Sequence, residues 1–370
     1  MADNVSTLSP GGDLGTPVGT GKQYATPAAW EADQQGLAAA GSTNELECYS
    51  GEYIQALING WLDVASIKMF AEPGSRHGGV LRENGGAGVR IDGIGTNAIY
   101  LLVSNCTIDG LELTTDTQNK DIVRASLDSS KTCPTVINCM IHAPDNIGVG
   151  TTYGILCDGN GPALIANNWV SNPKGRGISS SSDAAVTPIT IVNNYAYSND
   201  IPFLFRGNEL VKNCIAIALN GSDGYRLNTP LAGSTNNASY KSTETYIGDN
   251  PIYDVVLTDG VDFVSPSTGN YYPAAGGKLI DAGADTTADG VTTDIVDATR
   301  VIPFDVGPYE VVSVGPTPAV LTLPTVVEDV TTATIGCTTD TAGGTLYWYV
   351  STSATAPSVD NLKDGTGGVD

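Results

Sequence analysis

The sequence predicts an all-β solenoid, in which short strands stack turn upon turn along one axis. The main observation is a motif that occurs five times between residues 100 and 215: an aliphatic segment is followed by Asn and then by Cys or Asn. Steps of 33, 29, 26 and 20 residues separate the motif asparagines (138 − 105, 167 − 138, 193 − 167, 213 − 193), as in a solenoid with unequal loops. The composition agrees, because 44 Gly and 20 Pro accompany almost no helical periodicity. The five asparagines are Asn105, Asn138, Asn167, Asn193 and Asn213.

Each motif is expected to form a corner between two strands. The inward-facing positions have one parity up to the Asn and the other parity after it, which is what a one-residue corner produces. Asn tolerates the left-handed backbone that a sharp corner needs, and its amide both donates and accepts. We expect each Asn to bond the next one along the stack, with Cys106, Cys139 and Cys214 packed beside the column as small buried groups. Unrelated hairpin turns are the alternative, but these rarely recur at solenoid spacing.

One segment ahead of the motifs has the signature of a short helix. Thr26 occupies the N-cap position and Pro27 the first helical position, acidic residues follow, and Gly36 stands at the end. We expect this helix to cover the open end of the core, because terminal caps keep solenoids soluble.

The chain is expected to divide into an arm (1–20), the solenoid (21–312), a Pro-rich linker (313–318) and a small β module (319–370). The module contains three alternating segments typical of strands, with turn residues between them. Roughly 50 residues supply fewer strands than the seven of a β-sandwich. The module is therefore either completed by another chain or cut short where this sequence stops.

The charge balance excludes two classes of partner. Lys and Arg number 17 against 40 Asp and Glu, a formal net charge of −23, and no basic cluster occurs, so nucleic acid and anionic membranes are poor partners. Excess Asp is expected to keep a β-rich surface soluble. Ca²⁺ binding by the loops 281–285 or 294–297 is the alternative, although neither has a full calcium-loop signature. We expect no other cofactor or metal.

The cysteines and the first residues predict where the chain is assembled. Seven Cys form no disulfide framework, and three of them share one motif position, which is typical of thiols in a reducing cytoplasm. The start of the chain has neither a basic region nor an apolar core, so we expect no signal peptide. Release from the cell would then require lysis or a dedicated export route.

Stretches at both ends of the solenoid carry a resemblance to known proteins. They are residues 22–33, 45–49, 60–61 and 72–77 at the start, and 269–272, 279–283, 300 and 305–310 at the end. These stretches resemble right-handed parallel β-helix proteins of the pectate-lyase-like superfold, of the type found in phage genomes and environmental bacteria. The resemblance covers roughly residues 20 to 312 and implies a right-handed parallel β-helix with a short N-terminal capping helix. It leaves the activity open, because this superfold includes lyases, hydrolases, adhesins and inert virion parts.

A second resemblance concerns the C-terminal module. Residues 344–357 are similar to the first half of fibronectin-type or immunoglobulin-like modules, which are common in phage fibres and bacterial surface proteins. The expected fold is therefore all-β: a parallel β-helix followed by a β-sandwich module or part of one.

Catalytic residues are not evident. The paired Asp-Asp and Gly-His-Gly marks of polygalacturonases and the Arg-x-Pro-x-x-Arg mark of pectate lyases are missing. His77 and His142 have no Cys or carboxylate at metal-ligand spacing, which favours structural roles. Charged residues that could share one face of neighbouring coils remain as candidates, although ordinary residues at strand ends explain them too. These candidates are Asp158, Asp183, Arg206, Asp223 and Arg226.

Aromatic residues on successive coils admit two interpretations. Trp169, Tyr195 and Tyr197 could form a strip on which sugar rings stack. They could equally pack in the interior, because alternation turns some aromatic residues inward, and Phe203 and Phe205 share one parity.

The expected function is structural. A signal-free, acidic β-helix with reduced Cys and no catalytic marks suits a surface protein of a tailed-phage virion: a fibre, a spike or a capsid decoration. Its expected partners are other virion proteins, copies of itself and host polysaccharide. The alternatives are a tailspike-like polysaccharide depolymerase with a carboxylate pair on an exposed face, and an adhesin of a bacterial surface.

Overall fold

A computed structural model describes most of residues 3–311 and, beyond them, residues 326–328 and 333–335. The chain forms two compact units, Met1–Val311 and Val312–Asp370, which are described separately. Within the first unit the description omits residues 11–16, 18–20, 36–40, 60, 62–65, 83–85, 117–118, 127–133, 144–152, 159–162, 173–174, 181–188, 207–208, 219–222, 228–230, 241–254, 259–260 and 266–269.

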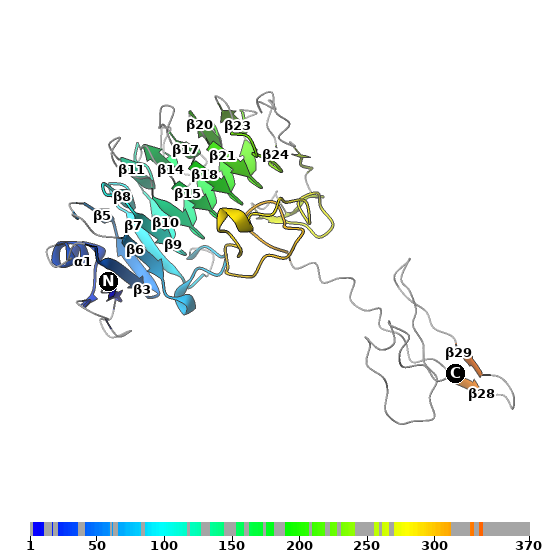
Figure 1. Ribbon diagram of the computed structural model, residues 1–370, viewed down its shortest axis with the longest axis horizontal. Helices are drawn as coiled ribbons and strands as arrows, with labels where there is room; N and C mark the ends of the chain where they lie inside the picture. The colour runs from blue at the N-terminus through cyan, green and yellow to red at the C-terminus, as the bar shows by residue number, and fades with distance from the viewer. Residues whose placement is uncertain are drawn as a thin grey trace. The chain divides into compact units, whose positions relative to one another are not determined.

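The first unit is a stack of parallel strands in three long sheets (Figure 1). From β3 to β23 the chain enters sheets A, B and C in turn, so each strand pairs with the strand three places later. Sheet A contains, in spatial order, β2 (Gln23–Tyr24), β1 (Asp3–Leu8), β3 (Thr43–Cys48), β6 (Ser66–Ala71), β9 (Cys106–Asp109), β12 (Thr135–Ile137), β15 (Ala163–Ala166), β18 (Ile189–Val192) and β21 (Glu209–Lys212).

Sheet B contains β4 (Gly51–Ile54), β7 (Val89–Gly93), β10 (Glu112–Thr115), β13 (Met140–His142), β16 (Trp169–Asn172), β19 (Tyr195–Ser198), β22 (Ile215–Ala218), β24 (Ala238–Tyr240) and β25 (Val255–Val256). Sheet C contains β5 (Ala56–Ile58), β8 (Ile99–Leu101), β11 (Val123–Ser126), β14 (Tyr153–Asp158), β17 (Arg176–Ser180), β20 (Phe203–Phe205) and β23 (Tyr225–Leu227). The expectation of an all-β chain with a β-helix-like fold is confirmed by these parallel sheets.

The core lies between the three sheets. In sheet B, Ile91, Leu113, Ile141 and Val170 follow one another in register on successive coils, and each is fully buried. Burial of each such side chain contributes about 1.5–3 kcal/mol, so aliphatic columns of this kind hold the stack together.

Aromatic residues fill the core near the end of the stack. Phe203 and Phe205 are buried, and the Phe203 ring stacks on Tyr225 of the next coil with centroids 4.9 Å apart. Phe203 and Phe205, which share one parity in β20, therefore both lie on the inner face of sheet C and in the core.

The N-terminal end of the stack is capped as the sequence predicted. Helix α1 (Pro27–Gln34) begins at Pro27, and the Thr26 hydroxyl accepts a hydrogen bond from the Ala29 N–H at 3.2 Å. Its Trp30 is buried against Trp61, with ring centroids 5.3 Å apart. Strand β1 falls within the segment expected to be an arm, and it pairs with β3 in sheet A. Sheet A therefore extends further at this end than sheets B and C.

Four of the five predicted corner asparagines, together with Asn236, form one column between sheets A and B. Asn138, Asn167, Asn193, Asn213 and Asn236 each follow or precede a paired strand at the same register, and each has a φ between 53° and 56°. Amide hydrogen bonds join some neighbours directly: the Asn167 Nδ2 donates to the Asn138 Oδ1 at 3.1 Å, and the Asn213 Nδ2 donates to the Asn193 Oδ1 at 2.9 Å. Asn236 is the column member that the motif search missed, because Ser and Thr precede it instead of an aliphatic pair.

The expected place of Asn105 and Cys106 in this column is wrong. The register aligns Ile137 with Asp109, so Gly110 is opposite Asn138, while Asn105 lies at the earlier corner, before β9. Gly110 has φ 73°, a conformation that glycine adopts at no steric cost, and its neighbour Asp109 accepts from the Asn138 Nδ2 at 3.1 Å. The true step to Asn138 is therefore 28 residues (138 − 110) instead of 33.

A second polar column runs beside the first. In register order it contains Cys139, Asn168, Asn194, Cys214 and Asn237, all buried. Each Asn amide satisfies backbone groups of the adjoining coils; for example, the Asn168 Oδ1 accepts from the Cys139 N–H at 3.0 Å and its Nδ2 donates to the Val136 carbonyl at 2.8 Å. Cys and Asn, both small side chains, therefore share this buried column.

The motif thiols are expected to be chemically inert in the folded protein. Burial raises the pKa of Cys106, Cys139 and Cys214 to about 12 in each case, and only a thiolate reacts rapidly. Iodoacetamide at pH 8 should leave these three thiols unmodified in the native protein and label them in urea, as read by peptide mass spectrometry. Labelling of Cys106, Cys139 or Cys214 in the native protein would contradict their burial.

The remaining elements are small. Strands β26 (Phe263–Ser265) and β27 (Asn270–Pro273) form an antiparallel pair, and the 3₁₀ turns η1 (Pro73–Ser75) and η4 (Thr287–Asp289) lie in connecting segments. In the second unit β28 (Val326–Glu328) pairs antiparallel with β29 (Ala333–Ile335). The expected β-sandwich module at 319–370 otherwise lies outside the described residues.

Candidate functional site

The charged residues proposed from the sequence as catalytic candidates lie at opposite ends of the sheet C strands. Asp158 ends β14, and the register puts Arg206 in the same column two coils later, roughly 10 Å away at about 4.8 Å per coil. Asp223 precedes β23 at the other edge, where its Oδ2 is 2.9 Å from the Arg226 Nη2. Asp183 lies outside the described residues. Among these candidates the structure shows Asp223 and Arg226 in contact.

The register separates Asp158 from Asp121, the carboxylate of the neighbouring coil, although the charge of Asp158 still adds to the causes that raise the pKa of Asp121. The register aligns Asp158 with Ser126, so five residues of extended chain, roughly 16 Å, separate the two along the strands. Glycosidase carboxylates lie about 5–9.5 Å apart. The Asp121 Oδ1 also accepts from the Tyr153 N–H at 3.2 Å, and burial is the main cause that raises the pKa of this carboxyl above its ordinary value.

A polar edge that the sequence did not reveal lies at the start of the sheet C strands. The Arg176 guanidinium lies over the Tyr153 ring, 5.4 Å from its centroid, and its Nη1 is 2.5 Å from the Tyr153 hydroxyl. The Arg176 Nε donates to the Asp200 Oδ2 at 2.9 Å. Arg124 lies similarly over Tyr100, at 6.0 Å. This edge presents cations, aromatic rings and carboxylates, groups that also recognise sugars.

The proposed aromatic strip on sheet B is not an open surface. Trp169, Tyr195 and Tyr197 do follow one another on the outer face of β16 and β19, and the rings of Trp169 and Tyr195 are stacked at 5.8 Å. However, Tyr195 is 1% exposed, and its neighbours pack against Leu279 and Val306 of a segment that follows the solenoid. These aromatic residues therefore lie on the outer face of sheet B and pack against the segment that contains Leu279 and Val306.

A buried charged cluster occupies the first coils of sheet B, and sequence reasoning missed it because its members come from separate coils. Glu112 is fully buried; its Oε2 accepts from the Arg82 N–H at 2.7 Å and its Oε1 lies 3.1 Å from the His142 Nε2. The Arg90 Nε donates to the Asp92 Oδ1 at 2.7 Å, and its Nη1 is 3.8 Å from the Glu112 Oε1. One guanidinium thus lies between two carboxylates of adjacent coils. With Glu112 closed off from solvent, this arrangement stabilises the coils and gives a substrate no access to it.

His77 has a structural role, as the sequence favoured. Its Nδ1 accepts from the Gly79 N–H at 3.0 Å, so its Nε2 carries the proton and donates to the Asn138 carbonyl at 2.7 Å. Burial lowers its pKa below the ordinary value, and the ring is therefore neutral at pH 7. The imidazole thereby joins the segment after β6 to the corner column.

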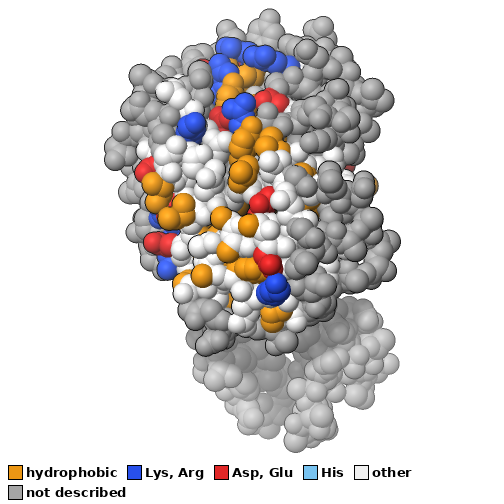
Figure 2. Space-filling view, turned by 90° about the vertical axis from the view of Figure 1, so that its left-hand side faces the viewer, with side chains coloured by type: hydrophobic (Ala, Val, Ile, Leu, Met, Phe, Trp, Pro, Cys, Tyr) orange, Lys and Arg blue, Asp and Glu red, His pale blue; other side chains and the backbone are white. Residues whose placement is uncertain are grey.

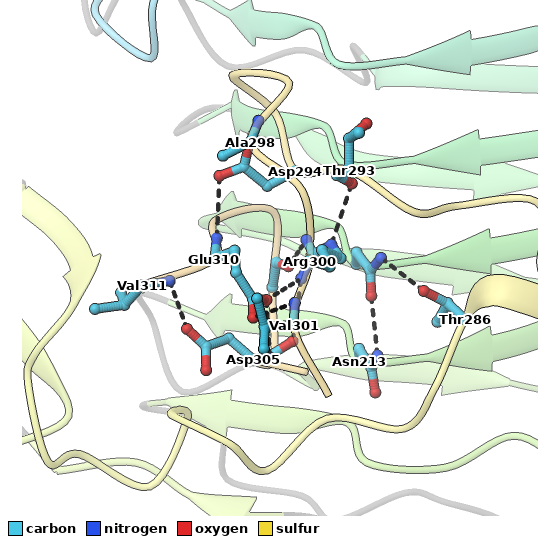
Figure 3. A network of polar contacts seen from close by, with 12 residues as sticks. Asn213, Thr286, Thr293, Asp294, Ala298, Arg300, Val301, Asp305, Glu310 and Val311 are labelled. Carbon is cyan, nitrogen blue, oxygen red and sulfur yellow. Dashed lines mark hydrogen bonds and ion pairs between the residues drawn. The ribbon is translucent and has the colours of Figure 1, made fainter. Parts of the chain in front are cut away.

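Residues 279–311 are fastened by a buried network around one arginine (Figure 3). The Arg300 Nη1 donates to the Glu310 Oε2 at 3.2 Å and to the Asp305 carbonyl at 3.4 Å. Its Nη2 donates to the Gly307 carbonyl at 2.7 Å and to the Asn167 Oδ1 at 3.2 Å. The Arg300 side chain is fully buried, so these contacts compensate a complete desolvation of its charge.

The loops considered for Ca²⁺ use their carboxylates within the chain. The Asp294 Oδ1 accepts from the N–H groups of Val296 and Ala298, and its Oδ2 accepts from Glu310. Asp297 pairs with Arg76 at 2.9 Å. Among the residues that the structure describes, no cluster of three or more His, Cys, Asp or Glu side chains is arranged to hold a metal ion.

Asp305 is expected to make stability depend on pH. Burial raises its pKa to about 6, above the ordinary 3.8, so the folded state binds this proton more tightly than the unfolded state. The contribution of Asp305 to the free energy of unfolding therefore increases as the pH falls from above 6 towards 4. Urea unfolding at pH 7 and pH 5 should show this difference in the wild type, relative to Asp305→Asn. An identical pH dependence of the two proteins would rule it out.

The N-terminal end of the stack carries exposed apolar residues. Figure 2 faces this end and shows hydrophobic side chains in a broken band, with Lys and Arg gathered at its upper rim. Large exposed hydrophobic residues of the first coils are Ile54, Leu57, Val80 and Ile94. In the described part of the chain, no helix is long and apolar enough to cross a membrane.

Comparisons of the chain with protein-family models and with curated proteins found no match.

Proposed function

We propose that the chain is a right-handed parallel β-helix that serves as a structural protein on the surface of a tailed-phage virion, as a fibre, a spike or a capsid decoration. The sequence resemblance over residues 20–312 supports the handedness and the phage type, and the resemblance of residues 344–357 to fibre modules points the same way.

One observation carries this proposal: the polar groups of the described coils bond the stack internally. Two buried columns of Asn and Cys, the Glu112 cluster and the Arg300 network all join coils to one another. A stack bonded along its length is stiff and resists unfolding, which a virion surface protein needs and which requires no chemistry. Assembly in a host cytoplasm follows from the same proposal, since buried thiols need no oxidation.

The surface features suit contacts with other proteins and with glycans. Ile54, Leu57 and Ile94 of the first coils are exposed, and exposed large hydrophobic residues suit docking of another virion protein or a second copy. The Tyr153 and Arg176 edge is partly exposed and suits contact with host polysaccharide.

The geometry gives a depolymerase less support. Asp121 and Asp158 lie at opposite ends of their strands, and Glu112, which does have a neighbouring carboxylate, is closed to solvent. An adhesin of a bacterial surface would use the same Tyr153 edge and is distinguished by where the protein is found.

The test is the location of the protein. Particles are purified by density gradient from lysates of the cells that carry this gene. Mass spectrometry should detect the chain in these particles, and antibodies against the chain should label intact particles in electron micrographs. Recovery of the chain only as a soluble secreted monomer, or only on cell envelopes, would overturn the proposal.

A further inference from the structure

The segment 279–311, here called the strap, follows the column of corner asparagines back along the stack. It begins after the last coils and meets the corners in reverse order. The Asn236 Nδ2 donates to the Ala282 carbonyl at 2.6 Å, and Asn213 both donates to the Ala284 carbonyl at 2.8 Å and accepts from the Ala284 N–H at 2.7 Å. The corner asparagines therefore bond an added segment as well as one another.

The next corners continue this pattern. The Asn193 Nδ2 donates to the Thr286 Oγ1 at 3.3 Å, and the Asn167 Nδ2 donates to the Thr293 carbonyl at 2.7 Å. Four consecutive corners thus contact the strap within a dozen of its residues. The positive φ of a corner explains why Asn occurs there. Hydrogen bonds to the strap explain why the amides of these asparagines point outwards.

Apolar packing holds the other side of the strap. Its Leu279 and Val306 lie in one buried cluster with Tyr195 and Ile217 of sheet B. Ile295 and Tyr309 lie in a second cluster with Met140. The strap therefore covers the outer face of sheet B, in addition to the corner column.

The last residues of the strap, which precede the second unit in the sequence, are bonded by carboxylates of the strap itself. The Val311 N–H donates to the Asp305 Oδ2 at 2.6 Å, and the Glu310 N–H donates to the Asp294 Oδ2 at 3.1 Å. Arg300 joins Glu310 to Asn167 of the column. Val311 is the last residue of the first unit, so a pull on the second unit reaches the β-helix through this network.

We infer that the strap attaches the C-terminal unit mechanically to the β-helix. The column of corner asparagines is the surface to which the strap binds, and the contacts of Arg300 must break before tension on the C-terminal unit reaches the coils. Hydrophobic contacts alone would cover sheet B. A buried guanidinium that contacts strap carbonyls, a strap carboxylate and a column amide adds a directional attachment at the point where force arrives. This inference does not depend on the virion proposal.

The test is single-molecule pulling of the full chain between its two ends in an optical trap. The strap has 33 residues (311 − 279 + 1), so its release should lengthen the chain by roughly 110 Å at about 3.3–3.6 Å per residue, before the coils unfold. At equal force, Arg300→Met should release the strap at least about 100-fold faster, because it leaves the buried Glu310 carboxylate without its counter-ion. Arg226→Met, which breaks an exposed ion pair away from the strap, should leave the release rate unchanged.

Two results would overturn the inference: a release rate of Arg300→Met within about twofold of the wild type, or rupture of the coils before a step of strap length. Glu310→Gln keeps the size of the side chain and should give a smaller acceleration in the same assay. It also provides the comparison if the Met variant does not fold, which far-UV circular dichroism would reveal.

Discussion

Replacement of Arg300 by Met is expected to lower the free energy of unfolding by about 3–5 kcal/mol, the usual effect of removing one partner from a buried ion pair. The loss is large because the side chain is fully buried and contacts Glu310, Asn167 and several carbonyl groups. Met fills a similar volume, so the charge and its hydrogen bonds are what the substitution removes. Urea unfolding followed by Trp fluorescence measures the change.

Two matched variants separate the buried charge from other effects. Arg226→Met removes an arginine from an exposed pair with Asp223 and should change the free energy of unfolding by less than about 1 kcal/mol. The double variant Arg300→Met/Glu310→Gln removes both charges, and it should be more stable than Arg300→Met because no unpaired carboxylate is left buried. Equal effects at positions 300 and 226 would show that the network is not a stabilising anchor.

Replacement of Asn213 by Ala is expected to destabilise the protein by roughly 3–6 kcal/mol. The side chain is fully buried and makes three hydrogen bonds, each of which contributes about 0.5–1.5 kcal/mol. The backbone φ of 53° adds about 1–2 kcal/mol for a residue with a Cβ that lacks the local bonding of Asn. Thermal and urea unfolding measure the total.

Asn213→Gly distinguishes the two contributions, because glycine loses the same hydrogen bonds but adopts a positive φ without strain. It should be about 1 kcal/mol more stable than the Ala variant. Exposed Asn119 has a similar φ of 60°, and Asn119→Ala should show the backbone cost alone. If Asn213→Ala were no worse than Asn119→Ala, the amide of the column would have no role in stability.

The sequence predicted the corners because the backbone preference of Asn and the parity change beside it are both local to each motif. Asn138, Asn167, Asn193 and Asn213 adopt the left-handed conformation that the parity change required. It placed the helix for the same reason, since Thr26 and Pro27 act on their immediate neighbours. Asn105 was misplaced because Gly110 performs the same backbone task with no side chain to match the motif.

The functional surface was less accessible to sequence reasoning. Trp169 and Tyr195 do lie on successive coils, with Tyr197 on the same strand as Tyr195, but whether that face meets solvent depends on residues such as Leu279 and Val306, far away in the chain. Arg300 and Glu310 were noticed only as part of a resemblance. The contact of Arg300 with Asn167 joins residues 133 positions apart.

The sequence by itself determined the repeating corner, the parity of the strands, the capping helix and the all-β class, because each depends on the backbone preferences and the alternation of adjacent residues. Only the tertiary structure decided which residues share a column, which face the strap covers and which charges are buried. The register of the coils and the face that the strap covers depend on how loops of unequal length bring distant segments together. The spacing of residues along the chain does not determine this arrangement.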